Sequence, residues 1–386
     1  MSHFPATGPL LSRRRLLVAA AAGVASACGP AKAVGYRGYC LVANRAGRNI
    51  GVVDLLRFRL RKQISLDAEP SEIVAHSSAP KAFVLSPETG TVWEIDTEKL
   101  TVSRRVRIAT RALNMALDST GKALWVLSRE PAELVELPFD SFSPRRRVRL
   151  PWAPNGFTLG ATNLAAIASY ANRSIAIVSL DRVAIDRVID AKDEPSILHF
   201  RKDGAQLIAG SHPDRALTII DAGSGKTVVR LPVGIGPRNF CPDNTGGQLY
   251  VTGDGLDAVV VIYPYETEVG QTILAGHAPG AMAVTQGDSP LLLVANPEND
   301  RITALDATNT GKSLVTVVDV GQEPHRIVIT PDNEYALALN RRSGDLSVIR
   351  RVSLSNGRPF RRPTPVFTMV SVGEEPVAAV VVPWSA

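Results

Sequence analysis

The stretch Leu292-Leu293-Val294-Ala295-Asn296 is a short apolar strand that ends in a small polar residue, and this pattern returns along the chain. Two further copies are Tyr39-Cys40-Leu41-Val42-Ala43-Asn44 and Leu124-Trp125-Val126-Leu127-Ser128. The eight strand ends are Asn44, Ser86, Ser128, Ser169, Ser211, Gly253, Asn296 and Asn340. They are 42, 42, 41, 42, 42, 43 and 44 residues apart. A constant period in the low forties with several strands per unit is typical of β-propeller blades.

Each repeat unit continues with the same order of elements. A second strand ends in aspartate, as in Val92–Asp96, and a short carboxylate is well placed to accept the N–H groups of a hairpin turn. A third strand such as Thr227–Leu231 follows. A proline then opens a fourth strand, at a position where no ladder hydrogen bond is lost. These prolines are Pro70, Pro154, Pro195, Pro237, Pro279, Pro324 and Pro376, and Arg111 takes the place in the third unit.

The number of units predicts how the ring closes. There are eight strand ends of the Asn44 kind and eight fourth strands, the last of them near the C-terminus. The unit that begins at Tyr39 has no fourth strand before it, so we expect Val377–Val382 to pair there as its innermost strand. This join removes an exposed sheet edge. The prediction is an all-β chain with one propeller of eight four-stranded blades over residues 39–386. Seven blades, with one unit as an insertion, is the alternative.

Residues 1–28 are interpreted as an export signal. Three arginines at 13–15 precede an apolar run of twelve residues, Leu16–Ala27. That run is too short for a membrane span, which needs about 20 residues, and the layout is typical of a signal peptide. Ser12–Leu17 resembles a twin-arginine signal, with the general secretory route as the alternative. Ala25–Gly29 resembles a bacterial lipobox in which Cys28 becomes lipidated, and simple cleavage near Ala27 is the alternative. Residues 29–38 are expected to be a short linker.

This signal predicts a periplasmic or cell-envelope protein, attached to the membrane through a lipidated Cys28. The net charge is +6, and removal of the three arginines before Cys28 leaves about +3. A surplus this small gives no reason to expect a nucleic-acid partner. Cys40 and Cys241 lie in units on opposite sides of the ring, too far apart for a disulfide, which needs Cα atoms within about 7 Å. We expect both to be buried free thiols.

The residues that enter the innermost strands should form a ring at one mouth of the propeller. We predict ligand binding at this mouth because all blades converge there. The leading candidates are His325, Arg238 and Glu72, which could supply a base, an anion clamp and a carboxylate. Arg326, Asn155 and Asn239 are polar neighbours in the same candidate set. The structural alternative is that these side chains only bind water and satisfy strand ends.

No motif for a metal or a covalent haem is present. The sequence lacks Cys-x-x-Cys-His and paired-cysteine zinc motifs, and no histidine has a second histidine at metal-ligand spacing, so neither a cofactor nor a metal site is expected. The basic stretch Arg145–Arg149 could face an anionic lipid or polymer, with solvated protection of a sheet edge as the alternative.

The segment Leu217–Gly234 resembles the YVTN-family repeat, and Ile327–Asn333 is similar to that family's strand followed by a Pro-Asp turn. The resemblance covers the chain from about Tyr36 to the end and implies a propeller. Members of the family include cell-envelope proteins, lactonase-like proteins and haem d1 propellers.

Three hypotheses of function follow from the resemblance and the candidate site. The first is an envelope scaffold that binds a protein or small-molecule ligand at its mouth, preferred to an enzyme because no catalytic constellation is clustered. The second is a lactonase-like hydrolase of sugar lactones. The third is a noncovalent carrier of a haem d1-type cofactor, with His325 as a candidate axial ligand.

Overall fold

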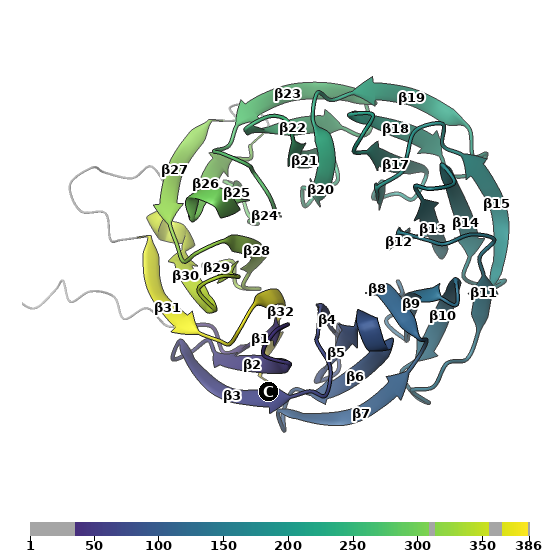
Figure 1. Cartoon of the computed structure of the whole chain (residues 1–386). Coiled ribbons are helices and arrows are strands. Elements are labelled where there is room, and N and C mark those ends of the chain that lie inside the picture. Colours follow the sequence, from purple (N-terminus) through teal and green to yellow (C-terminus); the bar gives the residue numbers. More distant parts are fainter. Residues whose placement is uncertain (1–34, 309–312, 355–364, 385–386) are drawn as a thin grey trace, which may run out of the picture. The chain divides into compact units, whose positions relative to one another are not determined.

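The computed structural model describes residues 35–308, 313–354 and 365–384. Within these ranges, thirty-two strands form eight antiparallel four-stranded sheets, which surround a common axis as blades (Figure 1). Three short 3-10 helices accompany them at Pro87–Thr89, Pro297–Asn299 and Arg351–Ser353. None of the described helices is long and apolar enough to cross a bilayer. The predicted signal peptide and Cys28 lie outside the described residues.

Each blade places one strand near the axis and three strands progressively further out. We number the blades from 1, the sheet β3-β2-β1-β32, to 8, the sheet β28-β29-β30-β31. The innermost strands of blades 1 to 8 are β32 (Pro376–Pro383), β4 (Glu72–Ala75), β8 (Arg111–Leu117), β12 (Gly156–Leu159), β16 (Ile197–Phe200), β20 (Gly236–Pro242), β24 (Met282–Val284) and β28 (Pro324–Ile329). The second strands are β1 (Gly38–Asn44), β5 (Lys81–Ser86), β9 (Ala123–Glu130), β13 (Leu164–Ser169), β17 (Gln206–Ser211), β21 (Leu249–Asp254), β25 (Leu291–Asn296) and β29 (Tyr335–Asn340).

The two outer positions follow in the same blade order. The third strands are β2 (Asn49–Asp54), β6 (Thr91–Asp96), β10 (Glu133–Pro138), β14 (Ser174–Ser179), β18 (Ala216–Asp221), β22 (Ala258–Tyr263), β26 (Arg301–Asp306) and β30 (Asp345–Arg350). The outermost strands are β3 (Arg59–Ser65), β7 (Thr101–Arg107), β11 (Arg147–Arg149), β15 (Ala184–Asp190), β19 (Thr227–Pro232), β23 (Glu268–Leu274), β27 (Leu314–Asp319) and β31 (Val366–Ser371).

The ring closes through the pairing that the sequence predicts. Strand β32 runs antiparallel to β1, with Tyr39 opposite Val382 and Ala43 opposite Ala378. The last strand of the chain therefore completes the first blade, and β1 has a partner on both sides. The prediction of eight blades is confirmed, and the seven-blade alternative is wrong because all eight units form complete sheets.

At several repeat ends the small residue is explained by a neighbouring connection. The side chain of Asn44 donates to the carbonyl of Val372, in the segment that crosses from blade 8 to blade 1, at 2.8 Å. Ser169 makes the equivalent bond to the carbonyl of Ala153 at 3.0 Å. At Gly253 no side chain fits, since a Cβ atom would lie 1.9 Å from the carbonyl oxygen of Gly236. These positions accept only residues that can bond to, or make room for, the incoming chain.

The recurring aspartates accept hydrogen bonds in the outer hairpins, as predicted. Oδ1 of Asp54 accepts from the backbone N–H groups of Leu56 and Arg57 at 3.0 and 3.1 Å. Asp96 and Asp221 make the same kind of bond in their own turns. The carboxylate thus accepts hydrogen bonds from turn N–H groups that have no strand partner.

The hydrophobic core lies between the blades. Eight apolar clusters among the described residues fill the eight interfaces, and one of them packs Leu41 of blade 1 against Trp93 of blade 2. Cys40 is fully buried in the interface of blades 8 and 1. Cys241 is also a free thiol but is only half-buried, which corrects the expectation of full burial. Its strand, β20, lies at the axis, where side chains are less covered.

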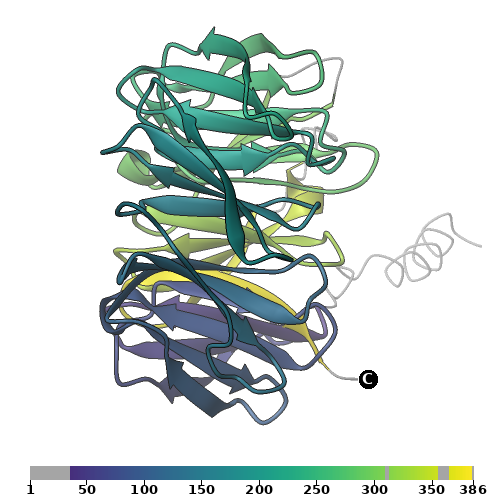
Figure 2. The same ribbon diagram turned by 90° about the vertical axis from the view of Figure 1, so that its right-hand side faces the viewer.

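The two faces of the ring carry different connections. On one face, which we call the proline face, the innermost strands begin beside the ends of the second strands, as Pro324 does opposite Asn340. On the opposite face, Gly38 pairs with Pro383, so the described chain begins and ends there. Seen from the side, the strands cross the thickness of the ring between these faces (Figure 2). Half-exposed side chains along β12, β16 and β24 indicate that solvent reaches the axis.

Candidate functional site on the proline face

Two of the predicted site residues lie in β-bulges at the start of innermost strands. Pairing of β28 with β29 shifts between Pro324 and Arg326, so His325 is the extra residue that has no partner in the ladder. Pairing of β20 with β21 shifts in the same way between Pro237 and Asn239, which leaves Arg238 as the extra residue. A bulge bends its strand and redirects a side chain, and such features are common beside binding sites. Both side chains are exposed at the proline face.

His325 lies near three arginines. We call His325, Arg326, Arg341 and Arg45 the mouth cluster. Partial burial and the nearby guanidinium groups of Arg341 and Arg326 lower the pKa of His325. The neutral form of its imidazole is therefore favoured. Within the described chain, no hydrogen bond or ion pair engages the side chain of His325 or of Arg326. The cluster thus offers an uncommitted ring nitrogen and an uncommitted cation.

The other two cations of the mouth cluster come from neighbouring turns. Arg341 follows β29 of blade 8 and forms an ion pair with Glu323. Arg45 follows β1 of blade 1, and its Nη1 lies 3.2 Å from a carboxylate oxygen of Glu375. Both of these arginines are thus paired with carboxylates, and the charge near His325 that no carboxylate matches is that of Arg326. This surplus of positive charge favours an anionic ligand.

Glu72 begins β4 of blade 2 and is electrostatically linked to the same cluster. Its Oε2 accepts from the backbone N–H of Met115 in blade 3 at 2.8 Å. Burial raises the pKa of Glu72 to about 7, while the Met115 bond and the positive charge of Arg326 act against the rise. Arg326 thus connects two of the three leading candidates, His325 and Glu72.

Arg238 belongs to a separate group on blades 5 and 6. Its Nε lies 2.7 Å from Oδ2 of Asp254, and Nε2 of His212 lies 2.8 Å from the same oxygen. The bond from Arg238, followed by the one from His212, lowers the pKa of Asp254. The charge of Arg238 is therefore matched by a carboxylate, and none of its described bonds reaches His325 or Glu72.

A groove of about 670 Å³ lies beside Arg238, between blades 6 and 7. On its wall His277 bridges two carboxylates, with Nδ1 at 3.0 Å from Asp257 and Nε2 at 3.1 Å from Glu298. The bond to Asp257 is the main cause of a raised pKa for His277. The lining of this groove holds three carboxylates against Arg238 and His277, so acidic groups outnumber basic ones there.

The two candidate asparagines make structural bonds. Nδ2 of Asn155 donates to the carbonyl of Pro195 at 3.2 Å, and Oδ1 accepts from the backbone of Tyr170 at 2.7 Å. Asn239 donates to the hydroxyl of Thr252 at 3.3 Å. These contacts hold neighbouring strand ends together. Whether any candidate residue binds a ligand stays a prediction.

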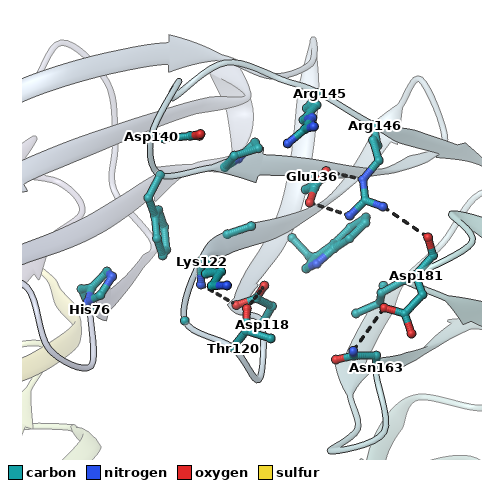
Figure 3. Close-up of a pocket in the computed structure, with 16 residues that line it drawn as sticks. His76, Asp118, Thr120, Lys122, Glu136, Asp140, Arg145, Arg146, Asn163 and Asp181 are labelled. Carbon is teal, nitrogen blue, oxygen red and sulfur yellow. Dashed lines mark hydrogen bonds and ion pairs between the residues drawn. The ribbon is translucent and has the colours of Figure 1, made fainter.

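A second pocket, of about 540 Å³, opens on the opposite face among blades 2, 3 and 4 (Figure 3). Arg146 bonds to both carboxylate oxygens of Glu136, at 2.5 and 2.7 Å, and extends toward Asp181. Asp118 accepts from Thr120 and from the backbone of Lys122. The stretch Arg145–Arg149 therefore lies partly in this pocket, where Arg146 is tied to a carboxylate.

Three charged residues of this face, Arg45, Arg341 and Asp254, were not among the residues predicted from the sequence. Each directly follows one of the small repeat-end residues, Asn44, Asn340 and Gly253. Since the second strands end at the proline face, the next residue in every unit lies at that face too. This repeat position is a usable signal, and it also includes His212.

The fold and these side chains define a class: an eight-bladed β-propeller with a basic site at one mouth. Comparison with solved structures agrees with the propeller fold. Dihydro-heme d1 dehydrogenase NirN in complex with DHE has a TM-score of 0.73 and 16% identity, over 92% of this chain and 78% of that one. Hydrazine synthase of Kuenenia stuttgartiensis has a TM-score of 0.57 and 18% identity, over 73% of this chain and 95% of that one.

A third similar structure is the Cps50 (Swd1) β-propeller domain of Myceliophteria thermophila, with a TM-score of 0.56 and 16% identity, over 72% of this chain and 96% of that one. At these identities the likeness concerns the fold. No protein-family model matches the chain, and no curated protein is significantly similar to it.

Proposed function

We propose that this protein is an exported cell-envelope propeller that binds an anionic ligand at its proline face and acts as a binding scaffold rather than as an enzyme. The observation that carries the proposal is the mouth cluster, where His325 and Arg326 project from one bulged strand with Arg341 and Arg45 beside them. Charge-assisted hydrogen bonds from guanidinium groups suit carboxylate or phosphate ligands. The YVTN resemblance agrees with an envelope role.

A haem d1-type tetrapyrrole is the second candidate ligand, favoured by two observations. The neutral form of His325 is favoured, and its side chain has no described hydrogen-bond partner, so a ring nitrogen is available to a metal. The surrounding arginines fit the carboxylates of such a cofactor. NirN, whose structure is a complex with DHE, shares the fold over 92% of this chain. If bound, the cofactor would supply redox chemistry, and His325 and Arg326 would hold it.

Two titrations test these candidates. Calorimetry with citrate measures binding of a simple polycarboxylate, and absorption spectra during titration with haem d1 report coordination of the iron. We expect Arg326→Gln to weaken either ligand about 10- to 100-fold, since loss of a charged hydrogen bond costs about 1.5–3 kcal/mol. His325→Ala should abolish the spectral change caused by coordination while leaving citrate affinity within a few-fold.

Matched controls lie on the same face. Arg238→Gln also removes an arginine from a bulge, and His277→Ala removes another exposed histidine, but neither residue belongs to the mouth cluster. Both variants should bind like the wild type. Equal binding by Arg326→Gln and wild type would contradict the assignment of the site, and an unchanged spectrum in His325→Ala would contradict the axial role.

The lactonase-like alternative has less support. A hydrolase of this kind would need its base, carboxylate and anion clamp to act on one substrate. Among the described contacts, Arg238 is tied to Asp254 and Glu72 to Met115, while His325 contacts neither. These side chains do not form one connected group.

The proposed location rests on residues 1–28. Export would follow from the signal peptide, and lipidation of Cys28 would attach the mature protein to the membrane. Intact-mass measurement of protein purified from the envelope distinguishes a lipidated chain that starts at Cys28 from simple cleavage. A chain that retains residues 1–28 would contradict export by this signal.

A further inference from the structure

The outer edge of blade 1 carries a group of cations at the face where the described chain begins. We call Arg37, Arg57, Arg59, Arg61 and Lys62 the basic edge. Arg57, Arg59 and Arg61 line a groove of about 290 Å³ together with Tyr39, Asp54 and Trp384. Arg37 directly precedes β1, and its carbonyl accepts from the backbone of Trp384 at 3.1 Å. All five cations are exposed.

Most of this charge is not neutralised. Arg57 forms an ion pair with Asp54 at 3.0 Å. Within the described residues, no ion pair or hydrogen bond involves the side chain of Arg37, Arg59, Arg61 or Lys62. Four cationic side chains therefore stand at this edge without a carboxylate partner.

On the neighbouring blades, arginines of the outermost strands form ion pairs with carboxylates. On blade 2, Arg104 pairs with Glu94 and Arg105 pairs with Asp67. On blade 3, Arg147 pairs with Glu133 at 2.8 Å. Charged residues on edge strands commonly prevent aggregation, and paired arginines serve that purpose. The outermost strand of blade 1 carries three cations without an ion pair, more than that of blade 2 or blade 3, so edge protection alone does not account for them.

The covalent chain leads from this edge to the predicted lipid anchor. Tyr36 is the eighth residue after Cys28, and an extended chain spans at most about 3.6 Å per residue, so the separation is at most about 29 Å. A lipid on Cys28 would therefore keep blade 1 close to the membrane. Tyr39 and Trp384, whose rings lie 5.7 Å apart beside the cations, are residue types favoured at lipid headgroups.

We propose that the basic edge docks onto anionic lipid headgroups and so orients the propeller with its proline face away from the membrane. This inference rests on the proposed envelope location and goes beyond it, since it names the contacting surface. Clusters of lysine and arginine beside a membrane anchor bind anionic lipids, and the attraction acts within about 8 Å at physiological salt. A tether of at most about 29 Å holds the edge near the surface, so the cations can come within that range.

The test uses the mature chain with Cys28→Ser, so that binding cannot come from a lipid on the protein. Co-sedimentation is measured with vesicles of phosphatidylcholine alone and of phosphatidylcholine mixed with phosphatidylglycerol. We expect binding only to the anionic vesicles, with affinity that falls as salt rises. The double variant Arg59→Glu/Arg61→Glu should bind at least about 30-fold more weakly.

The matched control is Lys202→Glu/Lys226→Glu, which changes the net charge equally. Both lysines are exposed on blade 5, on the same face of the ring. This variant should bind like the parent chain, and melting temperatures of both variants show whether the fold is intact. If the two double variants lose affinity equally, net charge rather than the basic edge is responsible, and the proposal is wrong.

Two other outcomes also overturn the proposal. Equal binding to neutral and anionic vesicles would show that headgroup charge is not recognised. Binding to polyglutamate without binding to either vesicle would assign the edge to an acidic protein partner. Because the vesicle assay uses an unlipidated chain and a surface far from His325, its failure is distinguishable from failure of ligand binding or of lipidation.

Discussion

The pKa of Glu72 shows how groups on two other blades influence a single residue. Its carboxyl bonds to the backbone of Met115 in blade 3 and is influenced by Arg326 of blade 8. Burial nevertheless dominates and raises its pKa from 4.5 to about 7. A carboxyl with such a pKa changes its charge near neutral pH, within the electrostatic influence of Arg326 of the mouth cluster.

This shift makes a prediction for stability. A raised carboxyl pKa means that the folded state favours the protonated form, so the stabilisation is complete at low pH and is lost as pH rises through about 7. Glu72→Gln keeps an acceptor for Met115 and cannot ionise. Between about pH 5 and pH 8 its free energy of unfolding should therefore rise relative to wild type by about 1–3 kcal/mol.

Denaturant unfolding at both pH values measures this difference. Glu98→Gln, which changes an exposed carboxylate of an outer turn, is the control and should show little pH-dependent difference from wild type. A Glu72→Gln variant whose relative stability stays constant across that range would show that the carboxyl is not desolvated.

At the scale of elements, the outer hairpin is the most regular part of each blade. In blade 2, Oδ1 of Asp96 accepts from the backbone of Glu98 at 3.0 Å and of Lys99 at 2.8 Å. These bonds, that from Lys99 first, lower the pKa of Asp96. The recurring aspartate is therefore a requirement of the turn, and its repetition carries no information about function.

Asp96→Ala should lower the free energy of unfolding by about 1–2 kcal/mol at neutral pH, because two backbone donors lose their acceptor. Asp96→Asn retains an acceptor oxygen and should cost less. The lowered pKa of Asp96 stabilises the folded state at pH values above 3.8, the ordinary pKa of aspartate, and this stabilisation is lost as the pH falls below it. The difference in stability between wild type and Asp96→Ala should therefore shrink in acid. Thermal melts of the three proteins decide the matter, and equal loss in both variants would contradict the acceptor role.

At the scale of the whole molecule, stability depends on closure of the ring. The core lies between blades, so each blade requires a neighbour on both sides. Strand β32 supplies the innermost strand of blade 1 and buries Val377 and Val382. Opening the ring there would expose an edge of β1 together with apolar surface.

A chain that ends at Gly373, and so lacks β32, should lose its single cooperative thermal transition and aggregate. Burial of Val377 and Val382 alone contributes about 3–6 kcal/mol, which is comparable to the whole stability of many domains. A chain that ends at Trp384 is the control and should melt like the full-length protein. Calorimetry that found the two truncated chains equally stable would contradict closure by β32.

The repeat architecture could be predicted from the sequence because its signals are local. Apolar alternation, turn aspartates and strand-opening prolines recur within each unit, and counting them yields eight blades and the closing strand. The same reasoning placed His325, Arg238 and Glu72 at the starts of innermost strands. It could not show which of them lie together, since residues of different blades approach one another through the curvature of the ring.

The chain order of residues thus specified the blade, the number of blades and the face on which polar side chains gather. Only the tertiary structure separates Arg238 from His325. It also brings the charge of Arg326 to act on Glu72 and shields that carboxyl from water. Folding also left Arg59 and Arg61 without an ion pair among the described residues, while it paired Arg104 and Arg105 of blade 2 and Arg147 of blade 3. The physical reason is that burial and charge pairing are set by neighbours from other blades, whereas strands and turns are set by neighbours along the chain.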